Sequence, residues 1–85
     1  MDERGLYKIV GRFLDRYNSR GLSGVYELRE NFNVEKYGKE EINAGELIIK
    51  MLERHSGTNS SERMHWADAV FREGVFYDLK RFFDL

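Results

Sequence analysis

The sequence predicts an all-α fold, in which a single domain of residues 1–85 forms a compact bundle of five to six short helices. Three observations predict this fold. The chain contains no proline, so no residue forces a helix to end. Apolar residues recur at the three- and four-residue intervals typical of helices, whereas the strict alternation typical of strands is hard to find. A chain of 85 residues has room for one hydrophobic core only.

The first helix is expected from Asp2 to Asn18. Apolar residues recur there at helical spacing and define one buried face: Leu6, Ile9, Val10, Phe13, Leu14 and Tyr17. Its end is predicted by Asn18, Ser19 and Gly21. A second, shorter helix is expected to begin with Ser23 as its N-cap and to end near Asn33, followed by a short helix or turn up to Ile42.

A capping box predicts the start of the central helix. Asn43 is followed three residues later by Glu46, the spacing at which two side chains satisfy free N–H groups at a helix start. Apolar residues in the segment that follows cover about 200° of the helix circumference. So wide an apolar surface predicts a central helix that packs against neighbours on several sides.

Two further helices are expected after a polar loop at residues 56–61. Gly74 is expected to end the first of them, and the last helix then runs from Val75 to Phe83. This last segment carries more apolar residues than one buried face requires. Two interpretations of the surplus stay open: core filling, and an exposed surface that serves a partner.

The formal net charge of −1 hides a segregation of charge along the chain. Residues 1–20 carry a net charge of +2, residues 27–46 carry −3, and the charges of residues 47–85 cancel. The basic residues recur at every fourth position and form what we call the basic ridge: Arg4, Lys8, Arg12, Arg16 and Arg20. The acidic residues form what we call the acidic face: Glu27, Glu30, Glu35, Glu40 and Glu41.

Three interpretations of this charge pattern stay open. Both surfaces can simply be solvated, the ridge can bind phosphates, or the two can be complementary faces that bind a partner. In the third case, copies associate head to tail when the two faces lie on different sides of the molecule. Reversing the charge at Arg12 or Arg16 is then expected to weaken association without unfolding the domain.

Residues that could support catalysis are scarce, so we expect neither an enzyme nor a cofactor. The absence of cysteine excludes a disulfide scaffold, a thiolate zinc site and a cysteine nucleophile. His55 and His65 are too far apart in the sequence for the usual metal-binding pair on one helix, and we expect no metal site. We recognise no secretory signal and no membrane-spanning run, so we expect a cytoplasmic domain.

Two segments resemble the death-fold superfamily, in particular its death-effector-like and bacterial effector-associated domains. Ala44–His55 resembles the central helix of these domains, and Phe71–Phe83 resembles their ending. One position departs from the death-effector motif Arg-x-Asp-Leu, because Phe76 stands where the motif places arginine. The resemblance implies six helices and a non-catalytic recruitment module. It also implies a contact between the first and fourth helices of one copy and the second and third helices of its neighbour.

Together these features predict a non-catalytic protein–protein interaction domain, an adaptor in signalling that associates through its basic and acidic faces. The expected partner is another protein, with homotypic assembly or a related helical domain as the options. The small net charge argues against nucleic acid as the main partner. The alternative is a small inhibitor or regulator that binds another protein or DNA, such as a phage-encoded inhibitor.

Overall fold

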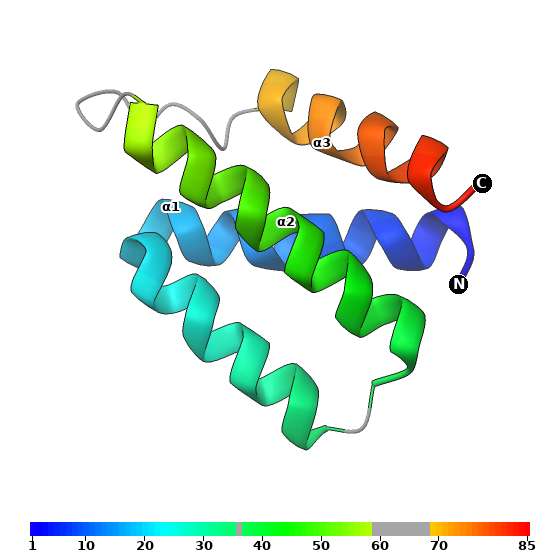
Figure 1. Cartoon of the computed structure of the whole chain (residues 1–85), viewed down its shortest axis with the longest axis horizontal. Helices are drawn as coiled ribbons and strands as arrows, with labels where there is room; N and C mark the ends of the chain where they lie inside the picture. The colour runs from blue at the N-terminus through cyan, green and yellow to red at the C-terminus, as the bar shows by residue number, and fades with distance from the viewer. Residues whose placement is uncertain (36, 59–68) are drawn as a thin grey trace.

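The computed structural model describes the backbone of residues 1–35, 37–58 and 69–85, and the side chains of residues 1–35, 37–55 and 71–85. Three helices and no strand occur over these residues: α1 (Glu3–Val34), α2 (Lys39–Thr58) and α3 (Ala69–Phe82). Figure 1 shows α2 crossing in front of the first half of α1, with α3 running alongside that half. The radius of gyration is 12.1 Å, close to the value of about 12 Å for a compact domain of this length. The predicted all-α class is confirmed.

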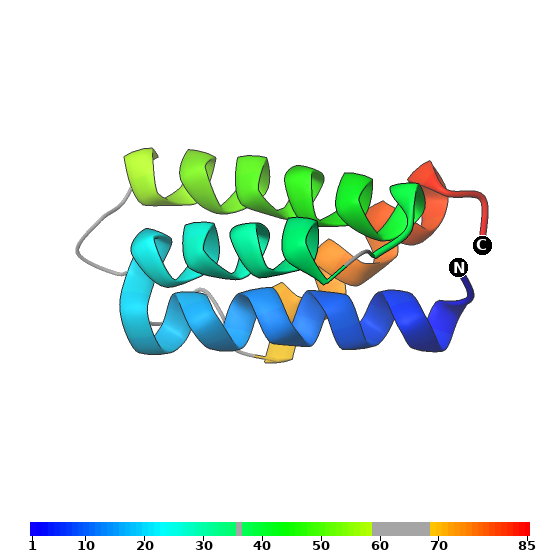
Figure 2. The same cartoon turned by 90° about the horizontal axis from the view of Figure 1, so that it is seen from below.

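Helix α1 consists of two halves that meet at Gly21. The helix begins with Asp2 as its N-cap, whose carboxylate accepts the N–H of Gly5 at 2.8 Å. Gly21 then adopts φ 69° and ψ −155°, a conformation that is essentially restricted to glycine. The chain turns there, and the second half of α1 runs back along the first, drawn between the first half and α2 in Figure 2. The two halves correspond to the first two predicted helices, and the predicted end of the first helix near Gly21 is confirmed.

The connection between α1 and α2 is shorter than predicted, and it contains no separate helix in its described residues. The N–H of Glu35 donates to the carbonyl of Asn31 at 2.8 Å and closes α1. The carbonyl of Gly38 accepts the N–H of Ile42 at 3.1 Å and opens α2. The predicted capping box at Asn43 is therefore wrong, since α2 begins four residues earlier. Glu40 and Glu41 lie in its first turn, where negative charge stabilises a helix N-terminus.

Helix α3 runs through Gly74, so the prediction that this glycine separates two helices is wrong. Glycine lowers helix stability by about 1 kcal/mol relative to alanine, but it does not force a helix to end. Val75 and Leu79 are buried against the rest of the protein, and this packing outweighs the cost of the glycine. Part of the helix expected before Gly74 lies outside the described residues. The predicted count of five to six helices is wrong for the residues that the structure describes, which form three.

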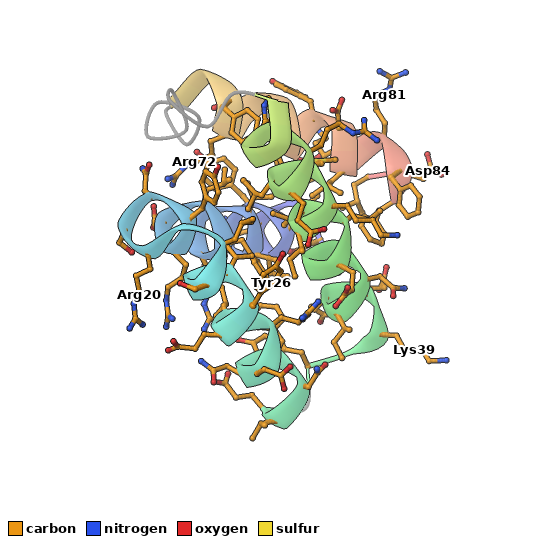
Figure 3. All side chains as sticks on the ribbon, turned by 60° about the vertical axis from the view of Figure 1, so that its left-hand side comes forward. Arg20, Tyr26, Lys39, Arg72, Arg81 and Asp84 are labelled. Carbon is orange, nitrogen blue, oxygen red and sulfur yellow. The ribbon has the colours of Figure 1, made fainter. Side chains whose placement is uncertain are left out.

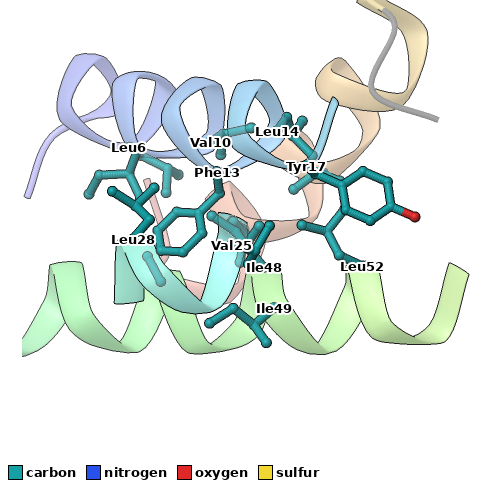
Figure 4. Packing of buried hydrophobic residues seen from close by; sticks show 14 of the residues in the cluster. Leu6, Val10, Phe13, Leu14, Tyr17, Val25, Leu28, Ile48, Ile49 and Leu52 are labelled. Carbon is teal, nitrogen blue, oxygen red and sulfur yellow. The ribbon is translucent and has the colours of Figure 1, made fainter. Parts of the chain in front are cut away.

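The hydrophobic core lies where the two halves of α1 meet α2, with α3 closing one side (Figure 4). All the residues of the predicted apolar face on the first helix are buried: Leu6, Ile9, Val10, Phe13, Leu14 and Tyr17. Phe13 contacts Phe32 in the second half of α1, with ring centroids 5.2 Å apart in an edge-on arrangement. Polar contacts also join this half to α2. The Tyr26 hydroxyl donates to the Glu53 carboxylate, a hydrogen bond that raises the pKa of Tyr26.

Gly45 provides the close approach between α2 and the Phe13 ring. A Cβ atom at position 45 would lie 2.9 Å from Cζ of Phe13, inside the van der Waals contact distance. We expect Gly45→Ala to lower the free energy of unfolding by about 1–3 kcal/mol through overpacking, measured by urea unfolding. The same substitution in a Phe13→Leu background should cost less, because the ring atom that it meets is gone. Equal costs in both backgrounds would contradict the close contact.

Candidate interaction surfaces

The bend at Gly21 brings part of the acidic face onto the basic ridge within one molecule. The Glu27 carboxylate lies 3.5 Å from Arg16 and 3.2 Å from Arg20. Figure 3 shows Arg20 projecting beside the second half of α1. All three side chains are at least one-third exposed, so these ion pairs contribute about 0–1 kcal/mol each to stability. Their main consequence is electrostatic, since part of each charged surface is neutralised by folding.

Arg12 of the basic ridge holds the connection between α1 and α2. Its guanidinium donates to the Tyr37 hydroxyl at 2.6 Å and lies 5.2 Å over the Phe32 ring. Tyr37 in turn stacks on Phe32, with ring centroids 4.1 Å apart and an interplanar angle of 12°. Charge reversal at Arg12 would therefore disturb the fold as well as the surface. Arg12 and Arg16 are poor positions for the charge-reversal test that the sequence suggested.

The remaining ridge residues, Arg4 and Lys8, are exposed and make no ion pair with any described residue. They line a shallow depression between α1 and α3 together with Tyr7 and Phe76. The Tyr7 and Phe76 rings meet edge-on with centroids 5.1 Å apart, and Tyr7 is 44% exposed. We call this set the basic–aromatic face: Arg4, Tyr7, Lys8 and Phe76.

The ammonium of Lys80 completes this region. It lies 5.7 Å from the centroid of Phe76 and 5.6 Å from that of Tyr77, and it forms an ion pair with Glu3 at 3.1 Å. Because Glu3 is paired with Lys80, the acidic side chain at the depression does not offset Arg4 and Lys8. The basic–aromatic face therefore presents positive charge around two aromatic rings.

The acidic face is also divided by folding. Glu27 is paired with Arg16 and Arg20, as described above. Glu40 accepts a hydrogen bond from the Met1 ammonium at 2.9 Å, and this contact raises the pKa of the ammonium. Glu41 lines a separate shallow depression that also contains Lys8, Arg12 and Tyr37.

Glu30 and Glu35 are the residues of the acidic face that stay exposed without an ion pair to any described residue. Val34 lies between them in the sequence, at the last position of α1, and its exposed fraction is 78%. We call this set the acidic end: Glu30, Val34 and Glu35. It combines two negative charges with one exposed apolar side chain.

The sequence located the charged residues of both surfaces but missed their apolar members. Tyr7 and Val34 do not stand out in the sequence, and Phe76 is only one of several surplus apolar residues in the last segment, because their exposure depends on how α3 packs and where α1 ends. The surplus of apolar residues in the last segment was the available signal. The surplus is divided between core and surface: Val75 and Leu79 fill the core, whereas Tyr77 and Phe82 are exposed. That the exposed part serves a partner stays a prediction.

A pocket of about 430 Å³ lies between α2 and α3, where the apolar side chains of Met51, Phe71 and Val75 line it together with Arg54, His55, Gly74 and Asp78. His55 lines its rim and meets the Phe71 ring edge-on, at 4.4 Å between centroids. Burial lowers the pKa of His55, so its neutral form is favoured. Across the described residues, no three or more His, Asp or Glu side chains gather in a way that could hold a metal ion.

No family model, curated protein or solved structure matches this chain. The resemblance to death-fold domains therefore stays a prediction. Over residues 1–35, 37–58 and 69–85, none of the helices has the length and apolarity needed to cross a membrane. The geometry of the surfaces carries the functional argument.

Proposed function

We propose that this chain is a non-catalytic protein–protein interaction domain, an adaptor or recruitment module that associates through complementary basic and acidic surfaces, including with other copies of itself. One observation carries the proposal. Among the residues that the structure describes, none forms an ion pair with Arg4 or Lys8 in the first half of α1, nor with Glu30 or Glu35 near the end of the second half. Opposite charges thus remain available at two separate places.

Complementary charges of this kind mainly orient the two molecules as they meet and increase the rate at which they associate. Exposed ion pairs are worth about 0–1 kcal/mol each, so two of them cannot supply a tight interface alone. Complementary charge instead steers encounters and suppresses the wrong partners. Apolar residues beside each charged pair, Tyr7 and Phe76 on one surface and Val34 on the other, are available to supply the remaining affinity. Death-fold resemblance implies the same function, but the proposal rests on these surfaces.

A charge-swap experiment tests the proposal. One variant carries Arg4→Glu with Lys8→Glu, and the other carries Glu30→Lys with Glu35→Lys. We expect the natural chain to associate at about 0.01 M salt and to dissociate as the salt concentration is raised to about 0.15 M. The reason is that added salt shortens the distance over which opposite charges attract one another. Each variant alone should associate about tenfold more weakly or worse, and equal mixtures of the two should associate again. Sedimentation equilibrium over a concentration series measures all four samples.

A control variant changes the net charge by the same amount as Arg4→Glu with Lys8→Glu does, but at other exposed positions. Lys50→Glu with Arg81→Glu serves this purpose, and circular dichroism checks that every variant is folded. This control should associate like the natural chain. A natural chain that stays monomeric at low salt would contradict homotypic association and favour an inhibitor or regulator of a different protein. Variants that fold but associate normally would contradict the role of the charges.

A further inference from the structure

We infer that Val34 of one copy inserts into the depression between Tyr7 and Phe76 of a second copy, so that the acidic end is the ligand of the basic–aromatic face. This inference rests on the proposed function, and it specifies the partner and the residues that meet in the contact. Val34 is the most exposed of the large hydrophobic residues that the structure describes. Its position at the last residue of α1 makes it accessible to a neighbour.

The depression offers what an exposed valine between two carboxylates requires. Its apolar part consists of the Tyr7 and Phe76 rings, which meet edge-on. Its charged rim consists of Arg4 and Lys8, which have no ion pair with a described residue, whereas Glu3 is held by Lys80 at 3.1 Å. Burial of Val34 against the rings is favourable, and both carboxylates would then face cations.

The order of the residues on the two surfaces agrees with the contact. Arg4 and Lys8 are four residues apart in α1 and lie on one side of the helix, about 6 Å apart along its axis. Glu30 and Val34 are also four residues apart in α1 and share one side of it, and Glu35 follows as the C-cap residue. Val34 is thus flanked in the sequence by two carboxylates, and the depression that it enters is flanked by two cations.

The contact has to join two molecules. Figure 1 shows the end of α1 on the opposite side of the molecule from α3, which carries Phe76. A single copy cannot bring Val34 to its own depression without unfolding. Each copy therefore offers one acidic end and one basic–aromatic face, and the contact is heterologous. Repetition of such a contact produces a ring if it closes and an open chain if it does not.

The aromatic rings suit a carboxylate-flanked apolar side chain better than a nucleobase. The Lys80 ammonium lies over the Phe76 ring of the depression and over the neighbouring Tyr77 ring, where it competes with a stacked base for one face of each ring. The chain also carries a net charge of −1, which disfavours a polyanion. A second copy supplies the matching charges and the apolar side chain in one segment.

Photocrosslinking tests the contact directly. p-Benzoylphenylalanine in place of Tyr7 keeps an aromatic ring in the depression and reacts with nearby C–H bonds. The modified chain is mixed at low salt with an equal amount of isotope-labelled natural chain, irradiated, digested and analysed by mass spectrometry. We expect the crosslinked product to join position 7 to the labelled peptide that contains Val34. The matched control carries the same group in place of Phe82, which is 67% exposed, and should not label that peptide.

Substitution of Val34 provides an independent readout. Val34→Ser should raise the dissociation constant of self-association by about tenfold, whereas Val34→Leu should change it by no more than about twofold. The insertion of Val34 would be overturned if the Val34→Ser variant kept the salt-dependent association of the natural chain. It would also be overturned if position 82 crosslinked to the Val34 peptide as strongly as position 7 does. Either result would leave the charge-based proposal intact. A natural chain that does not associate at low salt would contradict both the insertion of Val34 and the charge-based proposal.

Discussion

Replacing Phe13 with alanine is expected to lower the free energy of unfolding by about 3–5 kcal/mol. Phe13 is fully buried between the two halves of α1 and α2 (Figure 4), and its ring contacts both Phe32 and the backbone at Gly45. Its removal leaves a cavity at the point where three helical segments meet. Small domains are stable by about 5–15 kcal/mol in total, so this single change removes a large fraction of the stability.

Urea unfolding followed by circular dichroism measures this loss. Phe82→Ala is the matched control, because it deletes the same side chain at a position that is 67% exposed. We expect that control to change the free energy of unfolding by less than about 0.5 kcal/mol. Similar losses for both variants would show that Phe13 does not occupy the centre of the core.

Gly21→Ala is expected to lower the free energy of unfolding by about 1–3 kcal/mol. No atom lies within 4 Å of the position that a Cβ would take, so crowding does not cause the loss. The cause is the backbone: φ 69° with ψ −155° is strained for any residue that carries a Cβ. An alanine there opposes the bend on which the contact between Phe13 and Phe32 depends.

Gly74→Ala separates this backbone effect from the general effect of replacing a glycine. Gly74 also has open space around the position of a Cβ, but it lies inside α3 in a helical conformation. Alanine there should raise the free energy of unfolding by about 0.5–1 kcal/mol, because glycine is the poorer helix former. Opposite signs for the two variants are expected in thermal and urea unfolding. A loss of stability at both positions would argue against a special conformation at Gly21.

The errors of the sequence-based fold prediction have a common physical cause. Gly74 and Asn43 each carry a local preference for a helix boundary, and these preferences are worth only about 1–2 kcal/mol. Buried residues on the same helices, such as Leu79 in α3 and Ala44 in α2, belong to the core and favour a continuous helix. At Gly21 the local preference and the tertiary packing agree, and the predicted end of the helix is where the chain bends.

The candidate surfaces depend on contacts between distant parts of the chain. Spacing alone predicted the basic ridge, but it could not predict that Glu27 would neutralise Arg16 and Arg20 after the bend. Nor could it place Phe76 beside Tyr7, since this contact requires α3 to pack against the first half of α1. Which charges remain available to a partner was therefore a question of tertiary structure.

The sequence by itself determined the helical class, the buried face of the first helix, the end of that helix near Gly21 and the segregation of charge. Each of these follows from spacing or composition over a few residues, and a helix repeats its contacts over the same range. Only the tertiary structure decided how far α2 and α3 extend and which charged residues are paired internally. It also brought apolar side chains next to the unpaired charges. Packing between distant parts of the chain controls these features, and its energy exceeds the local conformational preferences of single residues.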